Sequence, residues 1–527
     1  MKKIRRNLFS GLYFFVLLMI IEVLLIILVQ FFLDAILSSF NVGDSEGKAI
    51  VVLIWTLIRL AESVFVVILY HRILNRHEDP EFKIAWLIFL LILPLFTAFI
   101  YITFGVHKIS KKEERVIELS RATYVPYLKA QHKANKDDME KIGRGIGTFS
   151  YIRNTTGMGF HSHNHIEYYK NGETFFPKMI EALKEAKEFI FIEFFIITDG
   201  KEWTEVRDIL IEKAKQGVEV RIVYDDLGCA GTISPRTPKK LGKYGIKCFK
   251  FHKFRPFLHR SYNNRTHRKI VVVDHKYAFT GGINLADEYA NEITRFGYWK
   301  DTMVRIQGSC ISNLITTFLQ DYDLCAKTPS DYNKYLDFEY PKFEDEGFVS
   351  AFGDGPGGID NALVGEQNYI NILNYAQKRC DISTPYLVPT YKLMDAMRNA
   401  ALRGVEVNLI LPGVPDKKLV YMIAKSNFRF LLDAGVHIYF YTPGFNHMKS
   451  AIADGELGFV GTINFDFRSL VHHFECGATL YKVPCLKELQ EDFNEMLSQS
   501  ERVPDTFKQK FLARFLCAIL KLFFPLL

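Results

Sequence analysis

The sequence predicts an α/β protein made of two similar halves, preceded by transmembrane helices. Two observations predict the halves: a strand–helix–strand order occurs twice, and the same spaced set of polar residues follows each copy. Long apolar stretches near the N-terminus predict the transmembrane helices. The length of 527 residues allows two or three domains.

The N-terminal region, residues 1–107, contains three apolar stretches that each reach the roughly 20 residues a membrane-spanning helix needs. They lie at about 8–33, 49–70 and 85–106. The first is longer than the apolar part of a signal peptide and lacks a small-residue cleavage site, so we expect it to be retained. Arg59 and Glu62 share one helical face of the second and could neutralise each other. Pro94 is expected to kink the third. A helix buried in a soluble core is the alternative, and it fits the second stretch better than the others.

The charges beside these stretches do not agree on one orientation. The opening Met-Lys-Lys-Ile-Arg-Arg predicts a cytoplasmic N-terminus. Both flanks of the third stretch are basic, with three cations before it and three after it: Arg72, Arg76, Lys83, Lys108, Lys111 and Lys112. Either one stretch does not cross fully, or the charge rule is broken once. The number of crossings and the side that carries the rest of the chain therefore stay open.

A charged, helix-prone connector at 108–150 precedes the two halves, which we place at 151–335 and 336–502. The first half is expected to contain a helix, a buried strand with Glu193 inside, a helix and a strand, at 175–187, 189–197, 201–216 and 218–224. The second repeats this order at 369–377, 380–387, 392–403 and 405–411. The letters GVEV begin at Gly217 and again at Gly404, each after a helix. This duplication predicts α/β units with mostly parallel, helix-covered strands. Two unrelated α/β domains would not explain the matching.

Two other segments have a distinctive composition. The glycine-rich run 352–361 predicts a flexible turn; a phosphate-cradling loop is the alternative, but the run lacks the Lys-Ser/Thr of a Walker loop. In the C-terminal region 503–527, Lys510, Arg514 and Lys521 fall at helical spacings, with apolar residues around the rest of the helix. That pattern predicts an amphipathic helix at the membrane surface, and packing against the core is the open alternative.

The repeated polar pattern is the most specific feature of the chain. Residues 264–284 read NRTHRKIVVVDHKYAFTGGIN, and residues 445–464 read FNHMKSAIADGELGFVGTIN. Each copy has His-x-Lys, an Asp seven residues after the His, Gly-Gly or Gly-Thr at 14 and 15, and an Asn at 17. The matched residues are His267, Lys269, Asp274 and Asn284, and His447, Lys449, Asp454 and Asn464. Chance does not readily produce this spacing twice, so we predict one active site built from both halves.

The chemistry of this set suits a phosphodiester. In an extended strand, the His and Lys of each His-x-Lys project to the same face. An imidazole can attack phosphorus while an ammonium holds the non-bridging oxygens, and the two asparagines could donate to the same oxygens. Two facing sets would supply one His as nucleophile and the other as acid and base, without a metal. A single His-x-Lys would more often be a solvated strand edge; the duplication reverses that preference.

These residues resemble the phospholipase D superfamily, whose signature is a doubled HxKxxxxD, and within it the bacterial cardiolipin synthases. The first half carries the resemblance in Asn263, Arg265, His267, Arg268, Lys269, Gly281, Gly282, Asn284, Asp287, Glu288, Tyr289, Trp299 and Asp301. The second half carries it in TPYLVP at 384–389, GTINFDFRS at 461–469 and Glu475. The departures are Thr266 where Asn is usual, Asn446 and Met448 beside the second His, and His473 where an Asn often precedes Phe-Glu. None removes a catalytic group.

The resemblance implies two phospholipase D-like halves with mixed sheets, and phosphatidyl transfer through a covalent phosphohistidine. His267 would be the nucleophile and His447 the acid and then the base. Lys269, Lys449, Asn284 and Asn464 would neutralise the five-coordinate phosphorus. Asp301 and Glu475 would each hydrogen-bond the second nitrogen of one imidazole. Asp274 and Asp454 would support the motif backbone or its lysine, and a surface salt bridge is the simpler reading of both.

The resemblance also implies a substrate and a location. Two phosphatidylglycerol molecules would give cardiolipin and glycerol at the bacterial cell membrane, in a multi-pass protein that needs no cofactor and no metal. The rival is a hydrolase, either a lipase that releases phosphatidic acid or a membrane-tethered nuclease. The net charge of +7 suits an anionic membrane surface, and no long basic stripe interleaved with aromatics favours nucleic acid. A non-catalytic scaffold is disfavoured because both motif sets are complete. Eight scattered cysteines without a CxxC pair predict buried thiols.

Overall fold

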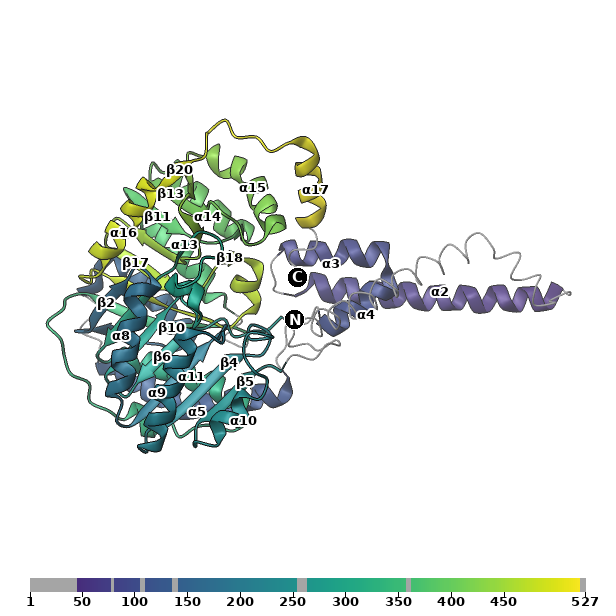
Figure 1. Cartoon of the computed structure of the whole chain (residues 1–527). Helices are drawn as coiled ribbons and strands as arrows, with labels where there is room; N and C mark the ends of the chain where they lie inside the picture. The colour runs from purple at the N-terminus through teal and green to yellow at the C-terminus, as the bar shows by residue number, and fades with distance from the viewer. Residues whose placement is uncertain are drawn as a thin grey trace. The chain divides into compact units, whose positions relative to one another are not determined.

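The computed structural model describes residues 45–76, 80–104, 110–134, 141–253, 263–356 and 362–521 (Figure 1). The chain divides into a small unit (1–107, 255–260 and 519–527) and a large unit (108–254 and 261–518). The large unit holds both motif copies. The apolar stretch predicted at 8–33 lies outside the described residues.

The first half of the large unit is a seven-stranded sheet in the order β2-β9-β7-β6-β3-β4-β5. Its strands are β2 (His165–Tyr169), β3 (Phe189–Phe194), β4 (Glu219–Asp225), β5 (Lys247–Phe251), β6 (Ile270–Val273), β7 (Tyr277–Gly281) and β9 (Met303–Gln307). Strands β3, β4 and β5 are parallel, whereas the pairs that involve β6, β7, β9 or β2 are antiparallel. The expectation of mostly parallel strands is therefore wrong, and the sheet is mixed. The reason is the short turn after β6: a few residues can join antiparallel strands, while parallel strands need a long crossover.

The second half repeats this topology in a nine-stranded sheet, β1-β10-β19-β17-β16-β11-β13-β14-β20. The strands that match the first sheet, position by position, are β10 (Phe348–Asp354), β19 (Glu475–Tyr481), β17 (Leu457–Gly461), β16 (Ser450–Ala453), β11 (Arg379–Ser383), β13 (Glu406–Pro412) and β14 (His437–Tyr441). Strands β1 (His161–Ser162) and β20 (Ser500–Arg502) extend the two edges. The internal duplication thus extends to strand order, and the phospholipase D-like fold implied by the motifs is found.

Helices pack against both sheets (Figure 1). In the first half they are α8 (Gly172–Glu185), α9 (Lys201–Lys215), α10 (Thr237–Gly242) and α11 (Ile311–Ala326). In the second they are α13 (Val364–Tyr375), α14 (Tyr391–Leu402), α15 (Lys418–Leu432) and α16 (Leu486–Ser498). Every residue of β3 is buried, as expected for a strand with apolar side chains on both faces. Much of the predicted connector forms α5 (Lys111–Ala134), which is joined to α11 by a hydrogen bond of 2.6 Å from Ser120 Oγ to Asp323 Oδ2.

Short segments link the two halves beside the motifs. Strand β8 (Tyr298–Lys300) of the first half pairs in parallel with β15 (Gly444–Asn446) of the second. Thr266 forms an isolated bridge with Phe474 across the same boundary. The residues directly before each motif histidine therefore bind the opposite half.

The small unit contains α2 (Ser45–Leu74), α3 (Pro80–Ile92) and α4 (Pro94–Phe104). Within the described ranges, Val52–Leu74 is the one helical segment long and apolar enough to cross a membrane, and length and composition alone support a crossing only weakly. Arg59 Nη1 donates to Glu62 Oε2 at 2.7 Å, the pairing expected for the second stretch.

The third predicted transmembrane helix, 85–106, is not a single helix. Helix α3 ends at Ile92, and a new helix begins at Pro94. Proline has no N–H to donate, and its ring obstructs the preceding helical turn. The rings of Trp86 in α3 and Tyr101 in α4 lie 5.1 Å apart, and Thr97 Oγ1 donates to Phe89 O at 2.8 Å. The two helices therefore fold back on each other. At about 1.5 Å per residue, neither arm exceeds roughly 20 Å, whereas a hydrocarbon core is about 30 Å thick. The multi-pass prediction is thus not supported by the described residues.

The C-terminal helix α17 (Phe511–Lys521) leaves large apolar side chains in solvent. Phe511, Leu512 and Phe515 are 82, 76 and 58% exposed. Its Cys517 is buried, with Sγ 3.5 Å from Met422 O in α15. One side of α17 thus contacts the core while its aromatic side does not.

Candidate active site at the junction of the two halves

The two motif histidines precede matching strands, His267 before β6 and His447 before β16. Each is fixed by the opposite half through its own backbone. His267 N–H donates to Phe474 O at 2.8 Å, and His447 N–H donates to Lys300 O at 2.7 Å. Both side chains are buried, with His267 6% and His447 8% exposed. Neither half alone could hold its histidine in this position.

Each imidazole is also paired with a carboxylate from the other half. His267 Nδ1 lies 2.9 Å from Glu475 Oε2, and His447 Nδ1 lies 2.6 Å from Asp301 Oδ2. In each case the carboxylate is the residue after the one whose carbonyl holds the histidine backbone. A carboxylate at Nδ1 selects one tautomer and leaves Nε2 for the substrate.

The Gly-Gly and Gly-Thr pairs of the two motifs differ because the carboxylates are held differently. A Cβ at Gly282 would lie 1.9 Å from Asp301 Oδ1, so only glycine leaves room for that aspartate. In the second copy, the Thr462 hydroxyl instead donates to Glu475 Oε2. Ser469 Oγ donates to Glu475 Oε1 at 2.5 Å. Both carboxylates are therefore positioned by their surroundings.

The two lysines are fully buried beside their histidines. Lys269 Nζ donates to His267 O at 2.5 Å, while Lys449 Nζ contacts His447 O and lies 3.5 Å from Asp301 Oδ2. Burial lowers the pKa of Lys269 to about 7 and that of Lys449 to about 8. The nearby carboxylates oppose this shift, and an anionic phosphate would do the same.

The electrostatics join the two motifs into one site. Burial is the main cause that lowers the pKa of both histidines well below the usual value. The next causes are the ammonium groups of Lys269 and Lys449, and each histidine is affected by the lysine of the other motif as well as its own. Burial also raises the pKa of Asp301 to about 6. The site thus gathers two neutral imidazoles and two cations, an arrangement that favours an anionic ligand.

The two motif asparagines differ in their contacts. Asn284 Oδ1 accepts from Ile196 N–H at 3.0 Å, and its Nδ2 donates to Tyr289 OH at 2.7 Å. Asn464 Oδ1 is buried and has no hydrogen-bond partner among the residues that the structure describes. Asn284 is therefore engaged in local structure, while the Asn464 amide has an unused acceptor.

The two motif aspartates do not lie with the other groups. Asp274 follows β6, seven residues and roughly 20 Å of extended chain beyond His267. It accepts three backbone N–H bonds of 2.8 to 2.9 Å from Lys187, Glu188 and Phe189, at the start of β3. Asp454 does the same at the start of β11, with Gln377, Lys378 and Arg379. The sequence placed both in the matched motifs in a supporting role, and the backbone that each of them binds belongs to the start of the neighbouring strand.

Two acidic residues that sequence reasoning did not single out, Asp225 and Asp321, bind arginines of the first motif. Asp225 at the end of β4 is fully buried and binds Arg265 Nε at 2.9 Å. Arg268 Nη1 lies 3.0 Å from Asp321 Oδ1, and its Nε donates to Glu475 O at 3.0 Å. Their signal is weak in sequence, because Asp225 ends strand β4 and Asp321 lies inside helix α11, with no spacing that relates either one to the motif.

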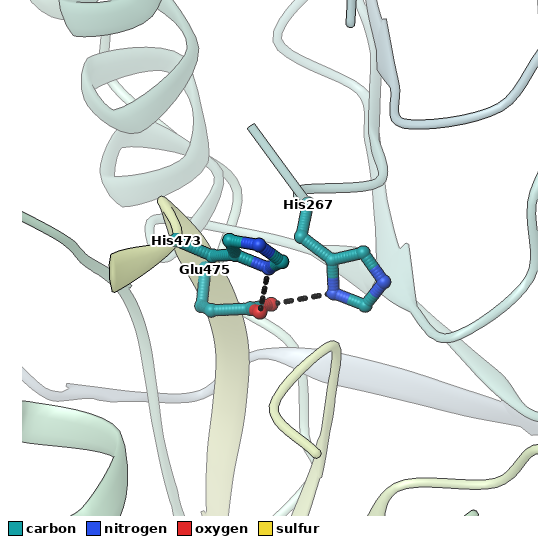
Figure 2. A group of neighbouring side chains, drawn as sticks. All are labelled: His267, His473 and Glu475. Carbon is teal, nitrogen blue, oxygen red and sulfur yellow. Dashed lines mark hydrogen bonds and ion pairs between the residues drawn. The ribbon is translucent and has the colours of Figure 1, made fainter. Parts of the chain in front are cut away.

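The unusual His473 lies beside the first catalytic pair (Figure 2). Its ring centre is 5.7 Å from that of His267, and its Nδ1 is 3.6 Å from Glu475 Oε1. Neither ring nitrogen has a hydrogen-bond partner within the described part of the chain. His473 thus adds a third imidazole to a site whose motifs supply two.

Comparison with known proteins agrees with this geometry. A family model described as cardiolipin synthase, PLD-like domain, matches twice, at residues 179–311 and 369–497. A second model, phospholipase D-nuclease N-terminal, matches residues 64–105. The crystal structure of phosphatidylserine synthase from Haemophilus influenzae Rd KW20 aligns with a TM-score of 0.53 at 15% identity, over 72% of this chain and 97% of that one. This likeness concerns the fold.

Similar sequences extend over most of the chain. An uncharacterized protein of Streptococcus mutans is 40% identical, over 86% of this chain and 98% of its own length. Cardiolipin synthase 2 of Bacillus anthracis is 33% identical, over 84% of this chain and 85% of its own length. Cardiolipin synthase of Alkalihalophilus pseudofirmus is 32% identical, over 86% of this chain and 90% of its own length. With these relatives, the doubled domain match and the paired histidine sites, the chain belongs to the cardiolipin synthase family of phospholipase D-like enzymes.

Proposed function

We propose that this protein is a membrane phosphatidyltransferase that condenses two phosphatidylglycerol molecules into cardiolipin and glycerol. The observation that carries the proposal is the pair of buried histidines, each backed by a carboxylate from the other half, at one site with two lysines. This arrangement supports two successive displacements at one phosphorus. The cardiolipin synthases among the relatives supply the substrate class.

In the first displacement, His267 Nε2 attacks the phosphorus of one phosphatidylglycerol. The phosphorus–oxygen bond to glycerol breaks, and the leaving oxygen takes a proton from His447. His447 enters this step as an imidazolium beside Asp301, because the bound anionic phosphodiester raises its pKa. In the second, His447 takes the proton of a hydroxyl on the second lipid. That oxygen attacks the phosphohistidine, releasing His267 and forming cardiolipin. One phosphodiester is broken and one is formed, so no nucleotide energy is needed.

The surrounding charges fit these steps. Glu475 would stabilise the positive charge that develops on His267, and Asp301 would do so for His447. Lys269 and Lys449 would neutralise the oxygens of the five-coordinate phosphorus, where developing charge is greatest. The anionic phosphodiester would raise the pKa of these buried cations and hold them protonated during the reaction.

Water is the competing acceptor, and a phospholipase D-type hydrolase is the second candidate. Burial of both histidines favours the transferase because it restricts bulk water at the intermediate. We also propose a bacterial cell-membrane location, supported by α2 and by the exposed aromatic side of α17. A lipid acceptor would then be abundant beside the site.

The test uses the purified full chain in phosphatidylglycerol vesicles, with a chelator and without nucleotide. We expect cardiolipin and glycerol in equal amounts by mass spectrometry. His267→Ala and His447→Ala should lose this activity, while His165→Ala, at a partly exposed histidine paired with Asp345, should keep it. Phosphatidic acid as the main product would establish the hydrolase instead, and near-normal activity in either catalytic variant would disprove the two-histidine scheme.

A further inference from the structure

The third imidazole, His473, forms a donor set with two residues of the transfer reaction. One ring nitrogen of His267, one of His473 and one carboxylate oxygen of Glu475 lie within 4.8 Å of one another (Figure 2). Two histidines and a glutamate are a donor set that zinc accepts readily. We propose that these residues form a binding site for Zn²⁺ or a similar divalent transition metal, which inhibits the enzyme by occupying its nucleophile.

The geometry is close to what a metal ion needs. Zinc bonds of about 2.0 to 2.1 Å place neighbouring ligand atoms about 3.4 Å apart. Glu475 Oε2 is already 2.9 Å from His267 Nδ1, and Oε1 is 3.6 Å from His473 Nδ1. Small side-chain rotations would complete a three-ligand set with one position left for water. Binding at Nδ1 of His267 would move the proton that now faces Glu475 to Nε2, so the nitrogen that attacks phosphorus would lose its lone pair and no net proton would leave.

Two independent features favour a ligand at His473. Both of its ring nitrogens are buried without a hydrogen-bond partner in the described residues, an arrangement that leaves polar atoms unsatisfied. The carboxylate it faces is held by Thr462 and Ser469, and outer hydrogen bonds of this kind orient metal ligands.

Among the residues that the structure describes, no such donor set surrounds the second histidine, although the two motifs otherwise correspond. Trp299 stands two residues before Asp301, as His473 stands two residues before Glu475. The ring of Trp299 is 5.7 Å from that of His447, the same separation as between His473 and His267. An indole has no lone pair to offer a metal. The proposed metal would therefore occupy the His267 side and leave His447 free.

The test measures metal binding separately from turnover. Dialysis of the chelator-treated full chain against buffered Zn²⁺ should give one tightly bound ion per chain, and His473→Asn should lose it. His165→Asn is the matched control, because it removes a histidine and carboxylate pair elsewhere in the large unit. In the vesicle assay, Zn²⁺ should inhibit reversibly, with at least a tenfold weaker effect on His473→Asn.

Equal zinc stoichiometry in the wild type and His473→Asn would overturn the proposal, and so would undiminished inhibition of that variant. A melting curve checks that the variant is folded, and His473→Gln provides a second substitution. Zinc binding is read without substrate, so its failure and a failure of the proposed function remain distinguishable.

A different observation, the helical hairpin in the small unit, addresses membrane topology. At the base of the hairpin, the end of α2, the start of α3 and the end of α4 are joined by hydrogen bonds. Lys83 Nζ donates to Leu74 O at 3.1 Å, and Arg76 Nη1 donates to Tyr101 OH at 3.1 Å. The opposite end of the hairpin is apolar. Leu91 is 76% exposed, Ile92 is 60% exposed and Leu95 is 54% exposed. We infer that α3 and α4 enter the bilayer from one face and return to it.

This topology resolves the conflicting charges. Basic residues on both sides of the hairpin then lie on one membrane face, which the positive-inside rule makes cytoplasmic. Only six peptide links separate Phe104 from Ser110, and they span no more than roughly 20 Å. The large unit must then start on the same cytoplasmic face. With α2 crossing once, Ser45 lies on the opposite, outer face.

Single cysteines test this topology with a membrane-impermeant maleimide, and the unmodified chain gives the background from its native thiols. In intact spheroplasts, Glu46→Cys should react, whereas Asn75→Cys and Lys111→Cys should react only after permeabilisation. Leu93→Cys, in the hairpin turn, should react in neither state. Labelling of Leu93→Cys or Lys111→Cys from outside would overturn the inference.

Discussion

At the scale of single residues, each motif histidine is paired with a carboxylate from the opposite half. His267 depends on Glu475 and His447 depends on Asp301, so each half completes the other. The spacing within a motif could predict the histidines and lysines, since their separation of two residues fixes their common face. It could not predict which carboxylate serves which histidine, because the partners lie 208 and 146 residues away.

Removing the charge of Glu475 tests its role without removing its size. Glu475→Gln should lower kcat by about 10² to 10⁴ with a small change in KM, because an amide neither fixes the tautomer nor stabilises the imidazolium. Asp301→Asn is the matched variant on the other histidine and should behave similarly. The measurement is steady-state cardiolipin formation, and a loss confined to KM would contradict the role.

The buried Lys269 should make stability depend on pH. Burial lowers its pKa to about 7 in the folded protein, against about 10.5 when unfolded. The unfolded chain therefore binds the extra proton between these values, and the free energy of unfolding rises as pH increases from about 7 to 10.5. Thermal unfolding of the ligand-free protein should show this rise, and Lys269→Met should show a smaller one. An equal slope in both proteins would argue against a buried, depressed lysine.

At the scale of elements, we interpret the two aspartates of the motif signature as structural. Each ties the end of the motif strand to the start of its parallel neighbour, through three backbone amides. Backbone bonding lowers the pKa of Asp454 against the effect of burial. The sequence showed these residues at fixed spacing, but only the β-pairing shows that the spacing spans a strand.

Asp454→Asn separates this structural role from catalysis. We expect it to destabilise the fold by about 2 kcal/mol, because an amide oxygen is a weaker acceptor for three N–H groups than a carboxylate. Its kcat at a temperature well below the transition should stay within a few-fold of the wild type. The wild-type contribution should persist above the unfolded pKa and disappear as pH falls through the lowered folded pKa. A large loss of kcat with an unchanged melting temperature would instead restore Asp454 to the reaction.

Element predictions failed where short connections reversed the chain. The sequence read the strands as mostly parallel, because it weighed the strand–helix–strand repeats before each motif and missed the hairpin after β6. It read 85–106 as one kinked helix, although Pro94 separates two helices whose aromatic side chains pack together. Composition identifies apolar segments, but a reversal depends on contacts between residues such as Trp86 and Tyr101.

At the scale of the whole molecule, duplication supplies two similar halves that place their histidines in different surroundings. The two sheets share one strand order, and the motif residues correspond one to one. The environments differ at His473 and Trp299, so the two histidines face different neighbours. A symmetric fold with asymmetric surroundings is suited to giving one histidine the role of nucleophile and the other that of acid and base.

The most direct test of this division of labour is to trap the covalent intermediate. His447→Ala, quenched after brief mixing with a short-chain phosphatidyl ester of 4-nitrophenol, should accumulate a phosphatidyl adduct on His267. This leaving group departs without a proton from His447, while the base for the second step is missing. Peptide mass spectrometry under alkaline conditions, which preserve phosphohistidine, would locate the adduct, and His267→Ala should carry none. An adduct on any other residue, or its persistence in His267→Ala, would contradict the assignment of His267 as the nucleophile.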